Sequence, residues 1–324
     1  MTAYERCAKS LFEQTYPDLE YVFIDDCTPD RSIDVLRHVM DEYPDSKDRV
    51  RIIRHDCNRG LGAARNTALD NATGEFIIHV DSDDYIDRDA VRILVEEQKE
   101  TDADIVTGNT LIVRAENSYE SPDPHYYDGH SMVLAILQRH HYIWNRLIRL
   151  SLYNDHGIRV KEGINCCEDY QQTPRLAYYA KKVARVNDIT YYYCQDNDVS
   201  YVHLYRYDYG IMLEALQSYM IIEKFFVDKG DDLYHLAHKR TAQQIEKVVE
   251  YSATCNDREY FRQMKDIVIH RYDDCNERRG WKRFLYRIAI SDFHLYKYYI
   301  KITRLYGYYK SLGENVLRKR MDVA

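Results

Sequence analysis

The feature that most constrains the fold of this chain is a largely apolar run over residues 76–80 that ends abruptly in Asp81, Ser82, Asp83 and Asp84. Such a run is typical of a buried strand. Carboxylates at the tip of a buried strand are costly to desolvate unless a cation or a polar ligand compensates them. The sequence therefore predicts a metal site at this strand end.

A second informative segment, residues 58–66, lies just upstream and is rich in small residues. Its glycines predict a turn that opens a helix, a place where the backbone can approach a ligand closely. The same turn brings Arg65 toward such a ligand. Together with the acidic turn, this segment predicts a metal-assisted diphosphate site.

Strand-like and helical patterns alternate over the first hundred or so residues. This alternation predicts an α/β fold with a mostly parallel sheet flanked by helices. Ligands of such sheets bind beyond the carboxyl ends of the strands, where Asp25, Asp26 and the acidic turn lie. The predicted strands are residues 21–25, 50–55, 75–80 and 104–108, and the predicted helices are residues 4–14, 32–42, 61–71 and 88–100.

The length of 324 residues suggests about two domains. We expect an α/β domain over residues 1–200 and a helical, basic region over residues 201–324. A polar stretch at residues 114–130 predicts a long loop that acts as a lid over the site. Further predictions are helices over residues 142–153 and 167–180, strands over residues 183–186 and 190–193, and helices after about residue 205.

The composition, 45% hydrophobic and 30% charged, fits a soluble globular protein and excludes the disordered and fibrous classes. No apolar run is long enough to span a bilayer, and Met1 is followed by polar sequence rather than by a signal peptide. These features predict a cytoplasmic protein. Eight cysteines without Cys-x-x-Cys spacing predict reduced thiols rather than a zinc site or a disulfide framework.

Charge is unevenly distributed along the chain. Residues 278–324 hold twelve Lys or Arg and three Asp or Glu, a net charge of +9, so residues 1–277 carry −17 when the whole chain carries −8. The acidic body argues against nucleic-acid binding. The basic tail suits a helix that lies on an anionic bilayer, at the inner face of the plasma membrane. A helical subdomain packed on the catalytic domain, or a dimer contact, explains this composition equally well.

Several short motifs follow one another in a familiar order. They are residues 13–17, 23–30, 58–66, 72–75, 81–84, 144–147, 162–163 and 168–169. Over roughly residues 4–200 the chain resembles glycosyltransferase family 2. The resemblance implies the A-type nucleotide-sugar-binding fold (GT-A), with the helical tail outside it, and a nucleoside-diphosphate sugar as donor.

The resemblance also assigns the donor site. An acidic pair after the second strand contacts the base and ribose in this family, which implies that Asp25 and Asp26 bind the nucleotide; a turn or a helix cap is the alternative. Arg65 would reach the diphosphate or ribose, with a surface ion pair as the alternative. Asp81 would contact the ribose and the metal. Asp83 is the best candidate to ligate Mg²⁺ or Mn²⁺ directly, since hard oxygen ligands suit both ions.

Glu168 and Asp169 match the position at which the family keeps its catalytic base. Inverting transfer needs a carboxylate opposite the leaving diphosphate to take the proton of the acceptor hydroxyl, and we assign that role to Asp169. Glu168 either binds the acceptor or forms a capping box with Asn165. Trp144 and Asn145 are candidates to stack on an acceptor sugar and to hydrogen-bond with it, with a buried core position as the alternative for Trp144.

The chain departs from the family at its start. Family members begin with an apolar strand before the helix that corresponds to residues 4–14, and this chain starts inside that helix. The missing strand would lie in the middle of the sheet, so two neighbouring strands would lack hydrogen-bond partners. Either the true start lies upstream, or the protein is a rearranged and inactive relative.

The function expected from the sequence is therefore inverting, metal-dependent transfer of a sugar in surface polysaccharide synthesis. The donor would be a nucleoside-diphosphate sugar, first of all a UDP-sugar, and the acceptor a glycan or a lipid-linked acceptor. The alternative is a catalytically inactive relative that binds nucleotide sugars.

Overall fold

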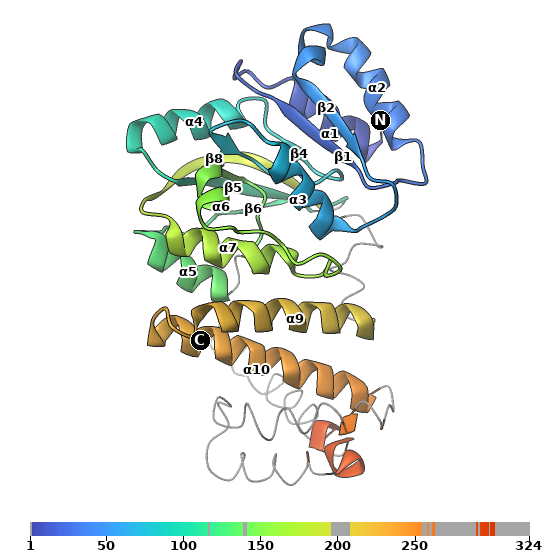
Figure 1. Ribbon diagram of the computed structural model, residues 1–324, viewed down its shortest axis with the longest axis vertical. Coiled ribbons are helices and arrows are strands. Elements are labelled where there is room, and N and C mark those ends of the chain that lie inside the picture. Colours follow the sequence, from blue (N-terminus) through green and yellow to red (C-terminus); the bar gives the residue numbers. More distant parts are fainter. Residues whose placement is uncertain are drawn as a thin grey trace, which may run out of the picture. The chain divides into compact units, whose positions relative to one another are not determined.

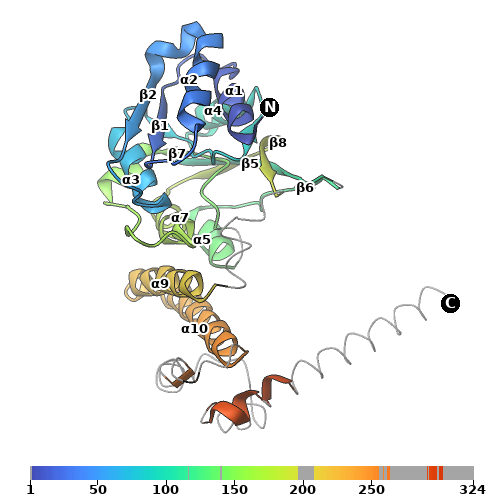
Figure 2. The ribbon, with the colours of Figure 1, turned by 90° about the vertical axis from the view of Figure 1, so that its right-hand side faces the viewer.

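The computed structural model describes residues 2–115, 117–138, 141–195 and 208–254, and a few shorter pieces between residues 258 and 301. The chain divides into two compact units, Met1–Ala237 and His238–Ala324. The α/β fold and helix α9 (Tyr209–Phe226) belong to the first unit, which extends past the boundary expected at residue 200. Figures 1 and 2 show this fold in two views at right angles.

Helices and strands alternate through the first hundred residues, as the sequence predicts. β1 (Tyr21–Asp25), α2 (Ser32–Glu42) and α3 (Leu61–Asn71) begin and end at the predicted residues. Amphipathic helices bury one face each, so Phe12 and Leu36 pack against Tyr21 of β1. The other elements of this part are α1 (Ala3–Phe12), the 3₁₀ helix η1 (Pro44–Arg49), β2 (Val50–Arg54) and α4 (Ala90–Thr101).

The strands form two sheets. β1 and β2 pair in parallel as a two-stranded sheet. A larger sheet has the order β3-β7-β5-β8-β4, with β6 paired to β5. The α/β class with flanking helices is thus confirmed. The strands of the larger sheet are β3 (Phe76–Ile77), β4 (Tyr85–Ile86), β5 (Ile105–Val113), β6 (Tyr119–Ser121), β7 (Arg146–Arg149) and β8 (Val183–Cys194).

The pairing is less parallel than the alternation of elements predicts. Only the β1–β2 and β5–β8 pairs are parallel among the described strands; the other four pairs are antiparallel. The strand and helix alternation ends at β5, and β6 folds straight back onto it, so a hairpin replaces part of the lid expected over residues 114–130. The helix predicted over residues 142–153 is wrong in its first half, because β7 precedes the short α6 (Leu150–Asp155).

The boundary between the two sheets lies between β1, in the two-stranded sheet, and β3, in the larger sheet. Each of these strands pairs with one other strand in the described part of the chain. Glu20, directly before β1, accepts hydrogen bonds from the amides of Thr73 (2.6 Å) and Gly74 (2.9 Å), shortly before β3, so the two strands start close together.

One face of the larger sheet is covered by α5 (Gly129–Gln138) and α7 (Glu168–Tyr179), and α9 packs on α7 (Figure 1). Met132, Leu176 and Phe226 contribute one buried side chain each from these three helices to a common core. The last long helix, α10 (Asp231–Thr254), begins in the first unit. No helix within the described ranges is both long enough and apolar enough to cross a bilayer. Most of residues 278–324 lie outside those ranges, so the membrane contact expected there stays a prediction.

Close packing of α5 on α7 predicts a specific effect of adding one methyl group. A Cβ atom on Gly129 would collide with the backbone carbonyl oxygens of Ala177 and Ala180. Because neither oxygen can move without shifting α7, we expect Gly129→Ala to lower the free energy of unfolding by about 1–3 kcal/mol. Gly210→Ala in α9 is the matched control: its Cβ atom would meet only the Asp208 side-chain oxygen, at 3.3 Å, and no backbone atom, so it should change the free energy of unfolding by less than about 1 kcal/mol. Denaturant unfolding measures both, and equal effects of the two substitutions would contradict the packing.

Candidate functional site

The acidic turn, residues 81–84, is fixed to β8 at both of its ends. Asp84 is fully buried and accepts hydrogen bonds from the Cys194 amide (2.7 Å) and the Tyr191 hydroxyl (2.8 Å). That hydroxyl in turn accepts a hydrogen bond from the Asp81 amide at 3.2 Å. Burial raises the pKa of Asp84 to about 8. Asp84 is thus an anchor of the turn, and one tyrosine hydroxyl joins the two ends of the turn.

Helix α1 holds the same turn from another side. Arg6 donates to the carbonyl of Asp83 at 3.3 Å, and the Cys7 thiol lies 3.6 Å from the carbonyl of Asp81. The half-buried carboxylate of Asp83 takes part in no hydrogen bond or ion pair with the described residues. The described chain has no ready cluster of three or more His, Cys, Asp or Glu for a metal. The Asp83 carboxylate fits the role of a single protein ligand to an ion such as Mg²⁺, which would take its other ligands from a diphosphate and water.

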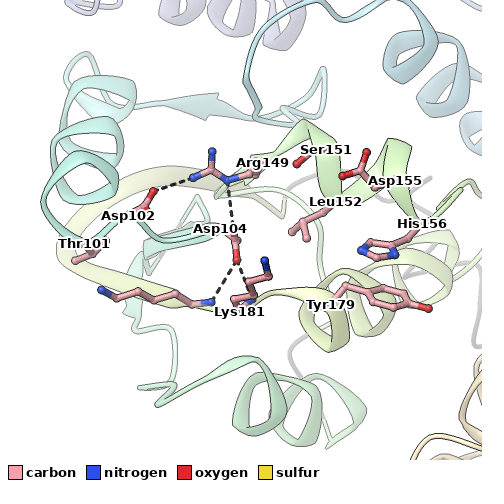
Figure 3. A pocket seen from close by; sticks show the side chains of 11 residues that line it. Thr101, Asp102, Asp104, Arg149, Ser151, Leu152, Asp155, His156, Tyr179 and Lys181 are labelled. Carbon is pink, nitrogen blue, oxygen red and sulfur yellow. Dashed lines mark hydrogen bonds and ion pairs between the residues drawn. The ribbon is translucent and has the colours of Figure 1, made fainter.

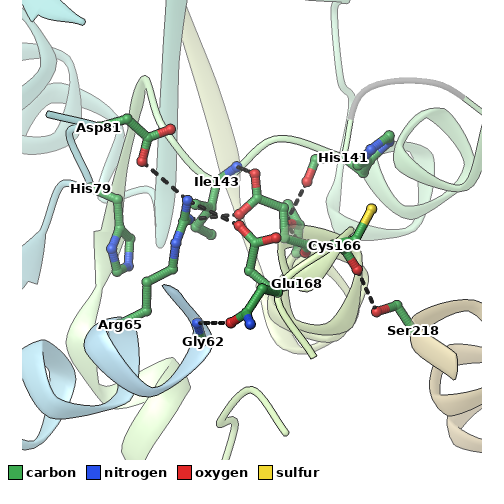
Figure 4. Close-up of polar contacts among 12 residues, drawn as sticks. Gly62, Arg65, His79, Asp81, His141, Ile143, Cys166, Glu168 and Ser218 are labelled. Carbon is green, nitrogen blue, oxygen red and sulfur yellow. Dashed lines mark hydrogen bonds and ion pairs between the residues drawn. The ribbon is translucent and has the colours of Figure 1, made fainter. Parts of the chain in front are cut away.

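A buried guanidinium joins the acidic turn to α7. The Arg65 side chain is 6% exposed and contacts three carboxylates from two different segments (Figure 4). Its Nη1 lies 2.6 Å from Asp169, and its Nη2 lies 3.1 Å from Asp81 and 3.2 Å from Glu168. The structure therefore brings together four of the residues that the sequence assigns to the site. Arg65 forms a buried ion-pair cluster instead of the surface ion pair considered above.

The ion-pair cluster around Arg65 contains more acidic than basic side chains, and most of it is buried away from water. Burial, then the neighbouring Asp169, raises the pKa of Glu168 well above its ordinary value. Burial also raises the pKa of Asp81 to about 6, against the opposing effect of Arg65. Burial and Arg65 lower the pKa of His79 to about 3, so this imidazole is neutral at physiological pH. An added cation would relieve the excess negative charge.

Asp169 is oriented on both of its oxygens. Oδ1 faces Arg65 at 2.6 Å, and Oδ2 accepts a hydrogen bond from the backbone amide of Ile143 at 3.2 Å. Asp169 lies in the first turn of α7, and its side chain is 14% exposed. Each carboxylate oxygen can accept more than one hydrogen bond, so this arrangement leaves room for a proton donor.

Asp25 and Asp26 both have partners inside the protein. Asp25 is 3% exposed and accepts a hydrogen bond from the Thr28 amide at 2.9 Å. Asp26 accepts hydrogen bonds from the amides of Arg59 (2.8 Å) and Gly60 (2.7 Å). Although partial burial opposes them, these bonds lower the pKa of Asp26. Asp26 thus fixes the loop that leads into α3, and its contact with a nucleotide stays a prediction.

A histidine that sequence reasoning missed completes this loop. The ring of His55 is 5% exposed and lies between Asp26 (Nδ1 to Oδ1, 2.6 Å) and the Thr67 hydroxyl (Nε2 to Oγ1, 2.8 Å). These contacts join β2 to α3. A single histidine at the end of a strand carries no sequence signal for such a role, because its partners are distant in sequence.

Asn165 closes the gap between the turn before α3 and the loop before α7. Gly60 has a positive φ of 87°, and a Cβ atom there would collide with the Asn165 side chain. The Asn165 oxygen accepts a hydrogen bond from the Gly62 amide at 3.4 Å. Contrary to the capping box considered for Asn165 and Glu168, Cys167 is the N-cap of α7. Asn165 instead fixes the distance between two helices of the site.

The structure corrects the acceptor role predicted for Asn145. Its side chain is 2% exposed, and its amide nitrogen donates to the carbonyls of Gly108 (2.7 Å) and Asn109 (3.1 Å) in β5. The amide is used inside the sheet and cannot reach a sugar. Trp144 is 8% exposed and stacks on Tyr142 and Tyr191, with ring centroids 4.1 and 4.7 Å apart. It occupies the core position that was its alternative.

A cavity of about 530 Å³ lies elsewhere, at the amino end of β5 (Figure 3). None of the site residues predicted from the sequence lines it. Arg149 on its wall is paired with Asp104 (3.0 Å) and Asp102 (3.2 Å). The acidic turn follows β3, which runs in the same direction as β5, so the cavity is at the opposite end of the sheet. The Arg65 cluster, in contrast, contains three carboxyl groups around one guanidinium group.

Residues 4–161 match the family described as glycosyl transferase family 2. The poly(ribitol-phosphate) beta-glucosyltransferase of Bacillus spizizenii is 27% identical over 286 residues, which cover 86% of this chain and 41% of that protein. The chain spans about half the length of the curated relatives it matches.

Solved structures share the fold. Staphylococcus aureus TarS 1–349 in complex with UDP-GlcNAc has a TM-score of 0.52 at 19% identity, covering 82% of this chain and 89% of that one. The mannosyltransferase PcManGT from Pyrobaculum calidifontis, in complex with GDP-Man and Mn²⁺, has a TM-score of 0.51 at 15% identity, covering 84% and 78%. At such low sequence identities, the structural similarity establishes the GT-A fold and nothing more. The match over residues 4–161, however, identifies that segment of the chain with glycosyl transferase family 2.

Proposed function

We propose that this protein transfers a sugar, with inversion, from a nucleoside diphosphate to a hydroxyl group of a surface polysaccharide or its lipid-linked precursor. The family supports sugar transfer, and similar folds in complex with UDP-GlcNAc and GDP-Man support a nucleotide-sugar donor. The name of the Bacillus spizizenii relative, a poly(ribitol-phosphate) transferase, supports a surface polymer as the acceptor. We propose UDP as the nucleotide.

The observation that carries the proposal is the meeting of Asp169 with Arg65 and Asp81 in one cluster. In the proposed reaction the acceptor oxygen bonds to the anomeric carbon while Asp169 takes its proton. The bond between that carbon and the diphosphate oxygen breaks, and its electron pair leaves with the nucleoside diphosphate. A Mg²⁺ or Mn²⁺ ion held at Asp83 would neutralise the negative charge that develops on the departing diphosphate.

The remaining predicted residues keep supporting roles in the proposal. Asp25 and Asp26 lie at the carboxyl end of β1 and are proposed to contact the base and ribose. Glu168, which lies 3.2 Å from Arg65 beside Asp169, is proposed to contact the acceptor. Trp144 and Asn145 are left out, because both are used inside the core.

A second candidate function is nucleotide-sugar binding without turnover. It is favoured by the division of the sheet between β1 and β3, each with one strand partner in the described chain. Isothermal titration with UDP and Mn²⁺, beside an assay of sugar transfer and donor hydrolysis, separates the two functions. Binding without turnover would favour the second candidate.

Removing the proposed base should separate binding from chemistry. Asp169→Asn keeps the shape of the side chain but takes up a proton poorly, so we expect kcat to fall by roughly 10²- to 10⁴-fold. The Kd for UDP should stay within about threefold of the wild type, since Asp169 is not proposed to contact the nucleotide. Asp155→Asn, on the exposed end of α6, is the control. Unchanged transfer by the Asp169→Asn protein would remove this assignment.

Removing the proposed metal ligand should affect only metal-dependent binding. With Asp83→Ala we expect the affinity for UDP in Mn²⁺ to fall to the value measured in EDTA, because the carboxylate that holds the ion is gone. Affinity in EDTA should be the same for both proteins. Titration calorimetry in the two buffers provides the comparison, and a Mn²⁺ effect as large as in the wild type would rule out Asp83 as the ligand.

A further inference from the structure

Helix α9 contacts the loop that directly precedes the proposed base, Asp169. Glu214 of α9 accepts two backbone hydrogen bonds on one oxygen, from Asn165 at 2.8 Å and from Cys166 at 3.2 Å. Both amides lie in the loop that precedes α7. A carboxylate that accepts backbone N–H groups makes charge-assisted bonds, which are stronger than neutral ones.

The loop needs such support because of its backbone conformation. Gly163 has a φ of 78° and Cys167 a φ of 57°, so two residues within five are left-handed. Cys167, with a Cβ atom, adopts this conformation at a cost. It is the N-cap of α7 and makes no capping bond with its side chain. Glu168 and Asp169 follow at once, so the loop decides where they point.

A second side chain of α9 binds the same loop. Ser218 is fully buried and donates to the carbonyl of Cys166 at 3.1 Å (Figure 4). It also accepts a hydrogen bond from the Gln171 amide group at 3.0 Å. Glu214 and Ser218 are four residues apart and therefore lie on one face of α9. Together they bind an amide and the carbonyl of Cys166, and so fix the peptide planes on both sides of this residue.

On its other side the loop touches the start of α3. The Asn165 side chain lies against Gly60 and accepts the Gly62 amide, while its own backbone amide donates to Glu214. One turn further along α3, Arg65 meets Asp169. Glu214 therefore supports the point at which the two helices of the cluster come together.

We propose that Glu214 is a positioning residue of the transferase site: it holds the loop before α7 so that Glu168 and Asp169 meet Arg65. The inference rests on the proposed function. It makes α9 a part of the catalytic unit, although α9 lies beyond the residues that match the family. Glu214 itself does not touch the reacting groups.

The test compares three variants of the full chain. In Glu214→Ala both amides lose their acceptor, and because small misplacements of a catalytic group are costly we expect kcat to fall by roughly 10- to 100-fold. Glu214→Gln keeps an uncharged acceptor, so its kcat should lie between the kcat of Glu214→Ala and that of the wild type. Gln217→Ala, at an exposed position of α9, is the control and should leave kcat unchanged.

Two further readouts distinguish positioning from general damage. The Kd for UDP with Mn²⁺ should stay within about twofold, since the hydrogen bonds of Glu214 go to Asn165 and Cys166 and not to Asp25, Asp26 or Asp83. Hydrogen exchange should become faster over residues 161–170 of the Glu214→Ala protein, because the amides of Asn165 and Cys166 are released. Faster exchange throughout the first unit, or an unchanged kcat, would overturn the inference.

The outcome for the proposed function is separate. A wild-type protein that binds UDP but transfers no sugar would remove the proposed function. Faster exchange confined to residues 161–170 in Glu214→Ala would still support the contact of Glu214 with the loop.

Discussion

The contact on which the site depends is the buried ion-pair cluster of Arg65. Its guanidinium is 6% exposed and meets Asp169 at 2.6 Å, with Asp81 and Glu168 close by. Taking such a group out of water is costly unless its hydrogen-bond donors find partners. The carboxylates provide those partners, and in doing so they fix α3, the acidic turn and α7 relative to one another. A change that displaces any of the three leaves an unpaired buried charge.

The surrounding fold supports this cluster by positioning the backbone. The Tyr191 hydroxyl joins both ends of the acidic turn, and Asp84 anchors it to β8. Asp26 and His55 fix the loop before α3, and Glu214 accepts hydrogen bonds from the loop before α7. Each of the three segments that meet at Arg65 thus has its own polar anchor. The anchors are mostly buried, where hydrogen bonds gain strength from the low dielectric constant.

Much of the first hundred residues could be predicted from the sequence, because local patterns decide it. The periodicity of residues 32–42 and 61–71 gave the ends of α2 and α3 correctly. The region after β5 could not be predicted as well. Residues 142–153 are apolar in a way that fits helix or strand, and pairing with β5 makes residues 146–149 a strand. Partners that are distant in sequence decided the outcome.

For the site, the sequence located the acidic residues but not their partners. Asp81, Glu168 and Asp169 were found from motifs, and the structure gathers them around Arg65. Asn145 was assigned to the acceptor because a polar residue beside a tryptophan suits a sugar site. Its burial against the carbonyls of Gly108 and Asn109 depends on sheet pairing, which no local pattern reveals.

The charge of the cluster bears on how a diphosphate can be accommodated. Arg65 was expected to contact the diphosphate, but three carboxylates already surround it, so little of its charge is left for a phosphate. A diphosphate brought next to Asp81 would meet repulsion that Arg65 alone does not offset. The divalent cation proposed at Asp83 would offset this repulsion without breaking the contact between Arg65 and Asp169. In that proposal the position of Asp169 depends on Arg65 and the binding of the donor depends on the divalent cation, so a substitution can change one and leave the other.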